Sequence, residues 1–594
     1  MTEAEMEVTA VLGVFDYVVV AMLLLLSSSI GLYYRLTGGK QATLKEFMLA
    51  DNSMPFVPVA FSLMASFMSA ITLLGVVQEM YMFGTMFIMI NLAYIICTPI
   101  VCYFYLPVFY NLQKISVYKY LELRFGYQTR LLASLSFTLQ MTLYTGIVLY
   151  APALALAAVT GLSQALSIAL VGSVCTLYSA LGGMKAVLIT DVLQSVLMFA
   201  AVLIVVCTGL QTFSLSQVFS IANQSGRLQF FSLDPDPRTR HTLWTQVLGG
   251  SVTYLSLYAV NQAQVQRLLA CRTLKQAQCA VWLQWPILMT LSLSTALAGL
   301  IIYAQYSQCD PLLTGVISKS DQVNYLYGAL CIGLAFVTAS LGAGVLQASL
   351  TVFGAVGGPL LGLFTLGMTT RSVGQRGAVM GLVVGLGLSL WIGFGQPKPS
   401  PSYKPRSIEG CADISTGRNV SFLLTVPPLA DTSADGRWSA DTSADGRWSA
   451  DTRHASIADK TARMTKDNVT DVRKPSSIGL TPNTTGEAGD PSGASSPSGG
   501  ASSPLHELYA VSYAWIGTIG FMSTYVTAVL LTLVTRCMSG AADADVDELL
   551  LTPCCRRKPP DADKLSCLAD VRQRGLLHND STNAFEEIMD NSKL

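Results

Sequence analysis

The sequence has little charge for its length. Only 12% of its 594 residues are charged and 51% are hydrophobic, whereas roughly 25% of a soluble domain is charged. This excludes an ordinary soluble enzyme. Lysine and arginine number 37, and aspartate and glutamate also number 37. The formal net charge is therefore zero, and the chain has no overall basic field that would gather nucleic acid.

Catalytic and cross-linking motifs are also missing. The chain contains no phosphate-binding loop of the Walker type, no zinc-ligand spacing and no nucleophile elbow. Its 13 cysteines imply no disulfide framework, because most of them lie in apolar runs, where a thiol behaves as a small hydrophobic group. We therefore expect neither catalytic residues nor a cofactor.

Long apolar runs dominate the chain instead. A helix needs about 20 mostly apolar residues to cross a bilayer. Twelve runs meet this need, near residues 15–34, 55–76, 82–108, 131–156, 163–182, 186–210, 246–262, 280–304, 325–341, 345–368, 377–396 and 507–535. The first run carries Asp16 and has neither a basic start nor a small-residue cleavage site, which indicates a retained helix. The sequence therefore predicts an all-α protein that crosses the lipid membrane many times.

Basic residues in short loops indicate how these runs are oriented, because such residues favour the cytoplasmic side. The tail 1–14 is acidic and is predicted outside. The loops after the first, third, fifth and seventh runs hold the basic residues and are predicted inside. The loop after the sixth run has a glycosylation sequon at Asn223, which is usable only on the outer side. The same loop contains Arg227, Arg238 and Arg240, which run against the charge rule.

The alternation fails after the eighth run. Continuing the count places Arg371 and Arg376 outside and the polar loop 397–505 inside. The sequons of this loop are at Asn419, Asn468 and Asn483. Both signals favour the opposite orientation. An odd number of extra crossings is needed between about 305 and 324, but that stretch is polar, so the sequence predicts a missing crossing.

The remaining segments are predicted to lie outside the transmembrane core of residues 15–396. Loop 397–505 is rich in Pro, Ser, Gly, Thr and Asp and is expected to be disordered and extracellular. Residues 506–536 form the last membrane helix and 537–594 a cytoplasmic tail. The chain ends in Ser592-Lys593-Leu594, which is either a plain terminus or one that a PDZ domain takes as an added strand.

The second run has small and hydroxylated residues at its middle, including Ala65, Ser69 and Thr72. A break in the helix there would free backbone carbonyl groups to hold a desolvated cation, as in the broken helices of secondary transporters. The same small residues would also allow close helix packing.

Two further runs carry polar residues. Asp191 is an acidic residue well inside a run, which makes it a functional candidate unless it forms a structural ion pair with Lys185. Its position near the cytoplasmic end of the sixth run suits ion release.

The seventh run ends in four amides within 261–266, which are too polar to face lipid and are expected to line a cavity or the cytoplasmic mouth. Tyr254 and Tyr258 share a helix face, either in a cavity or as anchors at the membrane interface.

Together these segments resemble the sodium/solute symporter family. The resemblance rests on the motifs Ala65–Ala70, Leu143–Pro152, Gly182–Asp191, Asn261–Arg267 and Gly357–Gly362. It covers about 15–396 and 507–535. The nearest branch contains the sodium-coupled monocarboxylate, multivitamin and iodide transporters. The resemblance implies a core of five plus five helices in an inverted repeat, like that of amino-acid transporters, with binding between the first helices of the two halves.

The resemblance also implies a function and its site residues. A small organic anion would be imported with Na⁺ by alternating access at the plasma membrane. Sodium would be held by the backbone oxygens of Ala65 and Met68, with Ser69, Thr72, Tyr144 and Asp191 nearby. The substrate would face Phe67, Tyr94, Tyr254 and Tyr258.

The branch, and with it the substrate, is suggested by shorter segments. Thr72 and the segment Tyr327–Gly333 look most like the monocarboxylate members, which makes monocarboxylates the preferred substrates. The segment Asp234–Pro237 resembles the multivitamin members, and Cys309–Gly315 resembles the iodide members.

The departure from the family lies at Gln322, which runs directly into Val323. Relatives have another membrane helix here, whose hydroxyls complete the sodium site. The resemblance and the loop charges thus locate the same missing crossing. Without this helix a hard cation would lack oxygen ligands on one side. A function of another class is therefore also open, namely a non-transporting splice isoform or an exon-skipped gene model.

Overall fold

In the part of the chain that its structure, a computed structural model, describes, the regular elements are helices. The described residues are 14–37, 43–160, 163–308, 345–396, 403–407, 504–539 and 546–556, and all of them belong to one folding unit. Within these ranges no strand occurs, and the only β-pairing is an isolated bridge between Met54 and Cys271. The all-α prediction is confirmed.

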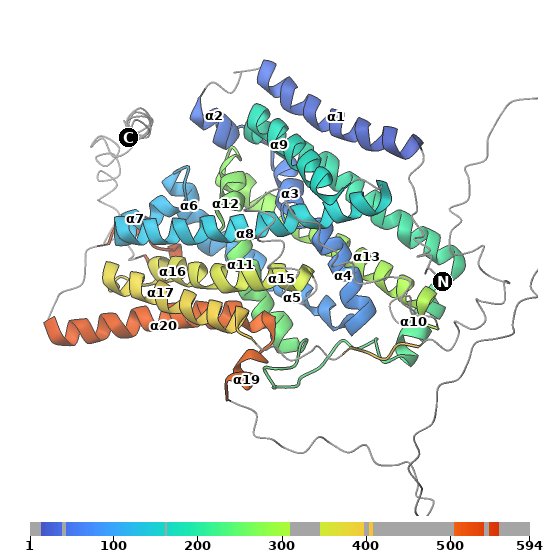
Figure 1. Cartoon of the computed structure of the whole chain (residues 1–594). Coiled ribbons are helices and arrows are strands. Elements are labelled where there is room, and N and C mark those ends of the chain that lie inside the picture. The colour runs from blue at the N-terminus through green and yellow to red at the C-terminus, as the bar shows by residue number, and fades with distance from the viewer. Residues whose placement is uncertain are drawn as a thin grey trace, which may run out of the picture. The chain divides into compact units, whose positions relative to one another are not determined.

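Helices follow one another along the chain, several of them interrupted (Figure 1). The elements used below are α1 (Val14–Leu36), α2 (Leu44–Leu49), α3 (Phe56–Ala65), α4 (Ala70–Phe83), α5 (Ile90–Ile100), α6 (Leu106–Leu112), α7 (Tyr118–Phe125), α8 (Tyr127–Thr160), α9 (Gln164–Thr212), α10 (Leu215–Gln224), η4 (Thr245–Gly249), α11 (Gly250–Tyr258), α12 (Gln262–Leu269), α13 (Leu274–Tyr306), α15 (Val345–Val352), η5 (Phe353–Gly357), α16 (Gly358–Thr369), α17 (Gln375–Phe394), α19 (Pro504–Tyr509) and α20 (Tyr513–Ser539).

Eight helices among the described residues are long and apolar enough to cross a membrane. They cover Tyr17–Leu36, Thr85–Leu112, Tyr127–Leu149, Ser179–Thr212, Leu274–Tyr306, Leu346–Thr369, Gln375–Phe394 and Tyr513–Met538. These match eight of the twelve predicted runs, so the chain is a multi-pass membrane protein.

Three of the other four runs are helical but interrupted. Run 55–76 is divided into α3 and α4, and run 246–262 ends at a break between α11 and α12. Run 163–182 forms the first part of α9, which turns at Gly183 with φ 59° and ψ −161°, a conformation that favours glycine. The fourth run, 325–341, lies outside the described residues.

Glycines allow helices far apart in the sequence to pack closely. Helix α20 contacts both α16 and α17, and α3 contacts both α9 and α13. A Cβ atom at Gly358 would collide with the carbonyl group of Gly517, and one at Gly362 would lie 2.8 Å from the Phe521 carbonyl oxygen. The motif Gly357–Gly362 therefore holds α16 against α20 at a distance that no side chain permits.

The three arginines that run against the charge rule are compensated within the protein. Arg227 is fully buried, lies 3.7 Å from the Tyr303 ring centroid and donates to the Tyr81 carbonyl at 2.8 Å. Arg238 pairs with Asp236 at 2.8 Å. Arg240 pairs with Glu79 of α4. Arg227 is thus buried, Arg240 is paired with a buried carboxylate, and Arg238 is paired at the surface. Because each of the three charges has partners within the protein, their loop can lie outside despite the charge rule.

The two described ends on either side of residues 309–344 meet this same loop. Tyr303, near the end of α13, packs on Arg227. Gln347, near the start of α15, accepts a hydrogen bond from Arg240 at 2.7 Å. Both ends therefore lie on one side of the helices. The predicted missing crossing, and the junction of Gln322 and Val323 at which it is placed, lie outside the described residues.

Part of the predicted tail packs onto the helices. In the segment 546–556, Leu550 and Leu551 are buried. The Tyr120 hydroxyl of α7 donates to the Leu550 carbonyl at 3.0 Å, and Glu548 pairs with Arg371 at 2.6 Å. Arg371 thus lies beside α7, which belongs to a loop predicted inside, as its charge favours.

We expect Leu551→Asp to destabilise the protein by about 3 kcal/mol, because the change removes a fully buried apolar side chain and places a charge among apolar groups. The effect is measured as a lower thermal unfolding midpoint of the purified protein. Leu549→Asp is the matched control, since Leu549 is exposed. Equal midpoints for the two variants would show that the segment does not pack on the helices.

Candidate transport site

The predicted break in the second apolar run is present. Helix α3 ends at Ala65 and α4 begins at Ala70. Around the break, the Ser62 carbonyl accepts from the Ser66 amide at 3.1 Å and the Met64 carbonyl accepts from the Met68 amide at 3.0 Å. The Thr72 hydroxyl donates to the Phe67 carbonyl at 2.8 Å. Carbonyl groups at the end of a helix lack partners in a following turn, so this is a place where backbone oxygens can bind a cation.

A second break lies between α11 and α12. Helix α11 ends at Tyr258, and Asn261 caps the start of α12 by accepting from the Ala263 amide at 2.9 Å. The Gln264 side chain donates to the Leu63 carbonyl of α3 at 3.3 Å, and the Gln266 side chain donates to the Met48 carbonyl of α2 at 2.8 Å. The amides of this segment thus join α12 to the backbone of other helices, and none of them lines the cavity described next.

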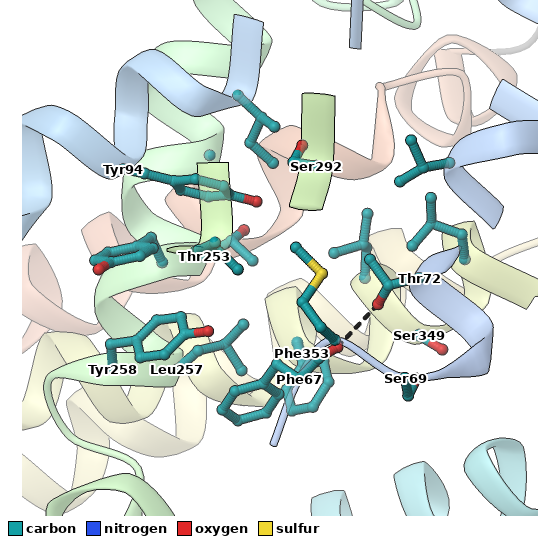
Figure 2. A pocket seen from close by; sticks show the side chains of 18 of the residues that line it. Phe67, Ser69, Thr72, Tyr94, Thr253, Leu257, Tyr258, Ser292, Ser349 and Phe353 are labelled. Atoms are coloured by element: carbon teal, nitrogen blue, oxygen red, sulfur yellow. Dashed lines mark hydrogen bonds between the residues drawn. The ribbon is translucent and has the colours of Figure 1, made fainter. Parts of the chain in front are cut away.

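A cavity lies beside the first break (Figure 2). Its volume is about 90 Å³, counted as the space open to the centres of water-sized molecules, where one water needs about 10–15 Å³. It therefore has room for a small ligand. Eight of the ten residues predicted for sodium or substrate line it: Phe67, Met68, Ser69, Thr72, Tyr94, Tyr144, Tyr254 and Tyr258.

Aromatic rings close one end of the cavity. The Phe67 ring lies 5.6 Å from the Tyr258 ring and 5.5 Å from the Phe353 ring, and the Tyr144 ring lies 4.5 Å from the Phe353 ring, measured between centroids. Tyr254 is 2% exposed and Tyr258 is 5% exposed. Both tyrosines are therefore cavity residues, and their alternative role as anchors at the membrane interface is wrong.

Among the described residues the lining is uncharged. Besides aromatic and aliphatic side chains it presents the hydroxyls of Ser69, Thr72, Thr253, Ser292 and Ser349. In Figure 2 the hydroxyl groups of Tyr94 and Tyr258 point into the space that Thr72 borders. A buried anion without a compensating charge is strongly disfavoured, so an anionic ligand in this cavity requires a cation beside it.

Sequence reasoning missed part of this lining. Thr253, Ser292, Ser349 and Phe353 were not among the predicted residues. A weak signal existed, because Ser349 and Phe353 are four residues apart and so share one face of a helix. Hydroxylated residues are common in apolar runs, however, and whether their side chains face the cavity depends on how α13 and α15 are placed.

Ala65 and Asp191 do not line the cavity. Ala65 is the last residue of α3, and Asp191 contacts the C-terminal turn of this helix. Asp191 of α9 is buried, accepts a hydrogen bond from the Ser62 hydroxyl at 2.5 Å and lies 3.5 Å from Nη2 of Arg267. Lys185 pairs instead with Glu46 of α2 at 3.2 Å. The alternative prediction of a pair between Asp191 and Lys185 is wrong, because α12 brings Arg267 to the carboxylate.

The predicted glycosylation sites fall in two groups. Asn223 lies near the end of α10 and is exposed. The other three sites lie outside the described residues; they are Asn419, Asn468 and Asn483.

Known proteins resemble this chain over most of its length. Residues 47–334 match the model of the "Sodium:solute symporter family". The "Putative sodium-dependent multivitamin transporter" of Drosophila melanogaster is 48% identical over 71% of this chain and 82% of its own length. The sodium-coupled monocarboxylate transporter 1 of Xenopus laevis is 40% identical over 70% of this chain and 78% of its own length. The human sodium/iodide cotransporter is 36% identical over 69% of this chain and 75% of its own length.

A solved structure supports the fold. The substrate-bound, outward-open structure of a Na⁺-coupled sialic acid symporter aligns with a TM-score of 0.53 and 22% identity, and covers 64% of this chain and 92% of that chain. The match is to a transporter fold. The relatives confirm the family and the branch that the motifs predict. The chain belongs to the sodium:solute symporter family.

Proposed function

We propose that this protein imports a small organic anion together with Na⁺ by alternating access across the plasma membrane. The observation that carries the proposal is an uncharged cavity beside a broken helix. Carbonyl and hydroxyl oxygens around the break suit a cation, and the apolar walls suit a small organic group. Because the lining offers no positive side chain, the sodium ion itself would balance the charge of the anion.

The sodium site in this proposal is built on the break. The backbone oxygens of Ala65 and Met68 would bind Na⁺, and the hydroxyls of Ser69, Thr72 and Tyr144 would lie near it. The break frees these oxygens from the helical ladder. Phe67, Tyr94, Tyr254 and Tyr258 would then enclose the substrate, as their rings border the cavity.

Asp191 would act on the path by which sodium leaves. Its carboxylate accepts from Ser62, one turn before the end of α3, and is thus close to the carbonyls at the break. An ionisable residue inside the membrane is a functional candidate by default.

The driving force of such a cycle is large enough for accumulation. A single Na⁺ that balances the anion moves no net charge, so the membrane voltage acts only on each further Na⁺ that moves inward with them. One such charge that falls through 100 mV supplies about 2.3 kcal/mol. At about 1.4 kcal/mol per factor of ten, this supports roughly fifty-fold accumulation of the substrate.

The two broken helices support an inverted repeat of five plus five helices. In such transporters the discontinuous helices occupy corresponding positions in the two halves and bind substrate between them. Here α3 and α4 would open the first half, and α11 and α12 the second. Both breaks adjoin one region, since Phe67 and Tyr258 lie at the same end of the cavity.

Monocarboxylates are the proposed substrates, in line with Thr72 at the break and with the monocarboxylate transporter 1 relatives. A vitamin such as biotin is the second candidate, favoured by 48% identity to the Drosophila melanogaster protein. Iodide is the third, through the iodide cotransporter.

The test is sodium-dependent uptake of labelled lactate, biotin and iodide by cells that express this chain, with surface biotinylation in parallel. We expect lactate uptake that disappears when choline replaces sodium. Uptake of biotin or iodide alone would move the assignment to that branch. Surface protein without uptake of any of the three would contradict the proposal.

A non-transporting isoform is a second proposal, and the flanks of residues 309–344 favour it. The end of α13 and the start of α15 lie on the same side. A chain with only one crossing between them would force the helices from α15 onward into the orientation that their loop charges disfavour. This proposal expects glycan on Asn223 and none on Asn419, Asn468 and Asn483, detected by mass changes on glycosidase treatment. Transcripts that always insert a further span between Gln322 and Val323 would exclude the isoform.

A further inference from the structure

An ion pair between a buried carboxylate and a partly buried guanidinium lies near the cavity. Arg240 precedes η4, and its guanidinium pairs with the Glu79 carboxylate of α4 at 2.5 Å and donates to Gln347 of α15 at 2.7 Å. The guanidinium also lies 4.0 Å from the Phe83 ring centroid and 5.1 Å from that of Tyr513. One side chain thus joins α4, α15 and α20.

These partners are direct neighbours of the cavity lining. Glu79 lies three residues after Val76 on α4, and Gln347 follows Leu346 on α15; Val76 and Leu346 line the cavity. A smaller hollow shares Phe87, Ile90, Gly250, Thr253 and Leu350 with the cavity and is bordered by Tyr513. The hollow therefore leads from the cavity toward the ring on which Arg240 packs.

The carboxylate of Glu79 and the guanidinium of Arg240 compensate each other's charge. Glu79 is 4% exposed, so its charge depends on Arg240 for compensation. Nε2 of His241 is hydrogen-bonded to the Tyr513 hydroxyl at 2.9 Å. The His241 ring also packs on the Phe87 ring, with 5.6 Å between the ring centroids. Burial and the neighbouring Arg240 hold the pKa of His241 well below its usual range, so His241 is neutral at pH 7.

We propose that the Glu79–Arg240 pair is the external gate of the cavity, and that its opening presents the Arg240 cation to the incoming anion. In the arrangement seen here Glu79, Gln347 and two aromatic rings hold the Arg240 side chain, and in this proposal it lies across the way out of the cavity. When α4 and α15 separate, the guanidinium loses these partners and attracts an anion toward a cavity that has no positive side chain of its own. The inference rests on the proposed function.

The closure is tested with a cysteine in the cavity. Thr253→Cys places a thiol on the lining, and its reaction with a membrane-impermeant thiol reagent measures how often the gate is open. We expect the pair Glu79→Gln and Arg240→Gln to speed labelling about tenfold, equal to about 1.4 kcal/mol. The double change removes both charges, so neither is left buried and unpaired.

The matched control is Arg238→Gln, which breaks an exposed pair with Asp236 in the same loop and is expected to leave the labelling rate unchanged. Protein without the introduced cysteine supplies the background from native thiols. Equal labelling rates with and without the Glu79–Arg240 pair would overturn the gate.

The attraction of anions is tested with the same cysteine. With Glu79→Gln alone the mouth keeps the Arg240 charge, whereas the double variant is neutral. We expect the ratio of labelling by an anionic reagent to that by a cationic reagent to be about tenfold higher in the single variant, again about 1.4 kcal/mol. An equal ratio would overturn the role of Arg240 toward the anion.

These outcomes are distinguishable from failure of the proposed function. Labelling of the cavity thiol needs no transport. Faster labelling of the double variant together with absent sodium-driven uptake would leave the gate standing and reject the symport assignment. Unchanged labelling together with normal sodium-driven uptake would reject the gate and leave the symport assignment standing.

Discussion

Replacing Asp191 with Asn is expected to raise the Na⁺ concentration for half-maximal uptake about tenfold, a loss of about 1.4 kcal/mol. Asparagine has the same shape and can still accept from Ser62 and Arg267, so the packing of α3, α9 and α12 is retained. A cation about 8 Å from a carboxylate gains about 2 kcal/mol at an effective dielectric constant of about 20. Removing this charge also leaves Arg267 uncompensated beside the path, which repels Na⁺ further.

Substrate affinity at saturating Na⁺ is expected to change by less than about twofold, or roughly 0.4 kcal/mol, because Asp191 does not line the cavity. The measurement is uptake as a function of Na⁺ and of substrate in a chain shown to transport. Glu46→Gln is the matched control, since it removes a carboxylate that pairs with Lys185 of the same helix. An unchanged sodium dependence in the Asn variant would limit Asp191 to a structural ion pair.

Gly358→Ala is expected to reduce the amount of folded protein at least several-fold. The added Cβ would collide with the carbonyl group of Gly517, where its distance to the carbonyl carbon is 2.9 Å. Both partners are backbone atoms, so α16 and α20 must move apart and the packing between them is lost. Overpacking of a well-packed core costs about 1–3 kcal/mol, and changes of about 1–2 kcal/mol already alter abundance several-fold in cells.

The readout is the monodisperse fraction of detergent-extracted protein in size-exclusion chromatography, with its thermal midpoint. Gly387→Ala in α17 is the matched control, because a Cβ at that position meets no atom within 4 Å and alanine favours the helix. If both variants behave like the unmodified protein, the close approach of α16 and α20 is not required for folding.

The break at the transport site was predictable because its cause is local. Small and hydroxylated residues between Ala65 and Ala70 weaken a helix that is otherwise apolar, and the chain does end α3 and begin α4 there. The two tyrosines one turn apart on α11 were also found, since helix geometry places them on one face. Whether that face meets lipid or a cavity could not be decided, because it depends on neighbouring helices.

The polar partners could not be predicted from the sequence. Asp191 lies six residues from Lys185 yet pairs with Arg267, and Glu79 meets Arg240, 161 residues away in the sequence. The amides that follow Asn261 were predicted to line a cavity or the cytoplasmic mouth; they are absent from the cavity lining, and two of them donate to the backbone of α2 and α3. Such pairings follow from how helices pack, and a sequence pattern carries no distance between residues far apart.

The sequence by itself determined that this chain is a multi-pass helical membrane protein with a broken helix and a buried acidic residue, because burial in lipid and helix periodicity depend on local composition. The tertiary structure alone decided which side chains share the cavity, that Arg240 pairs with Glu79, and that residues 546–556 pack on the helices. Those features require segments distant along the chain to lie within a few ångströms, and only the packing of the helices brings them together.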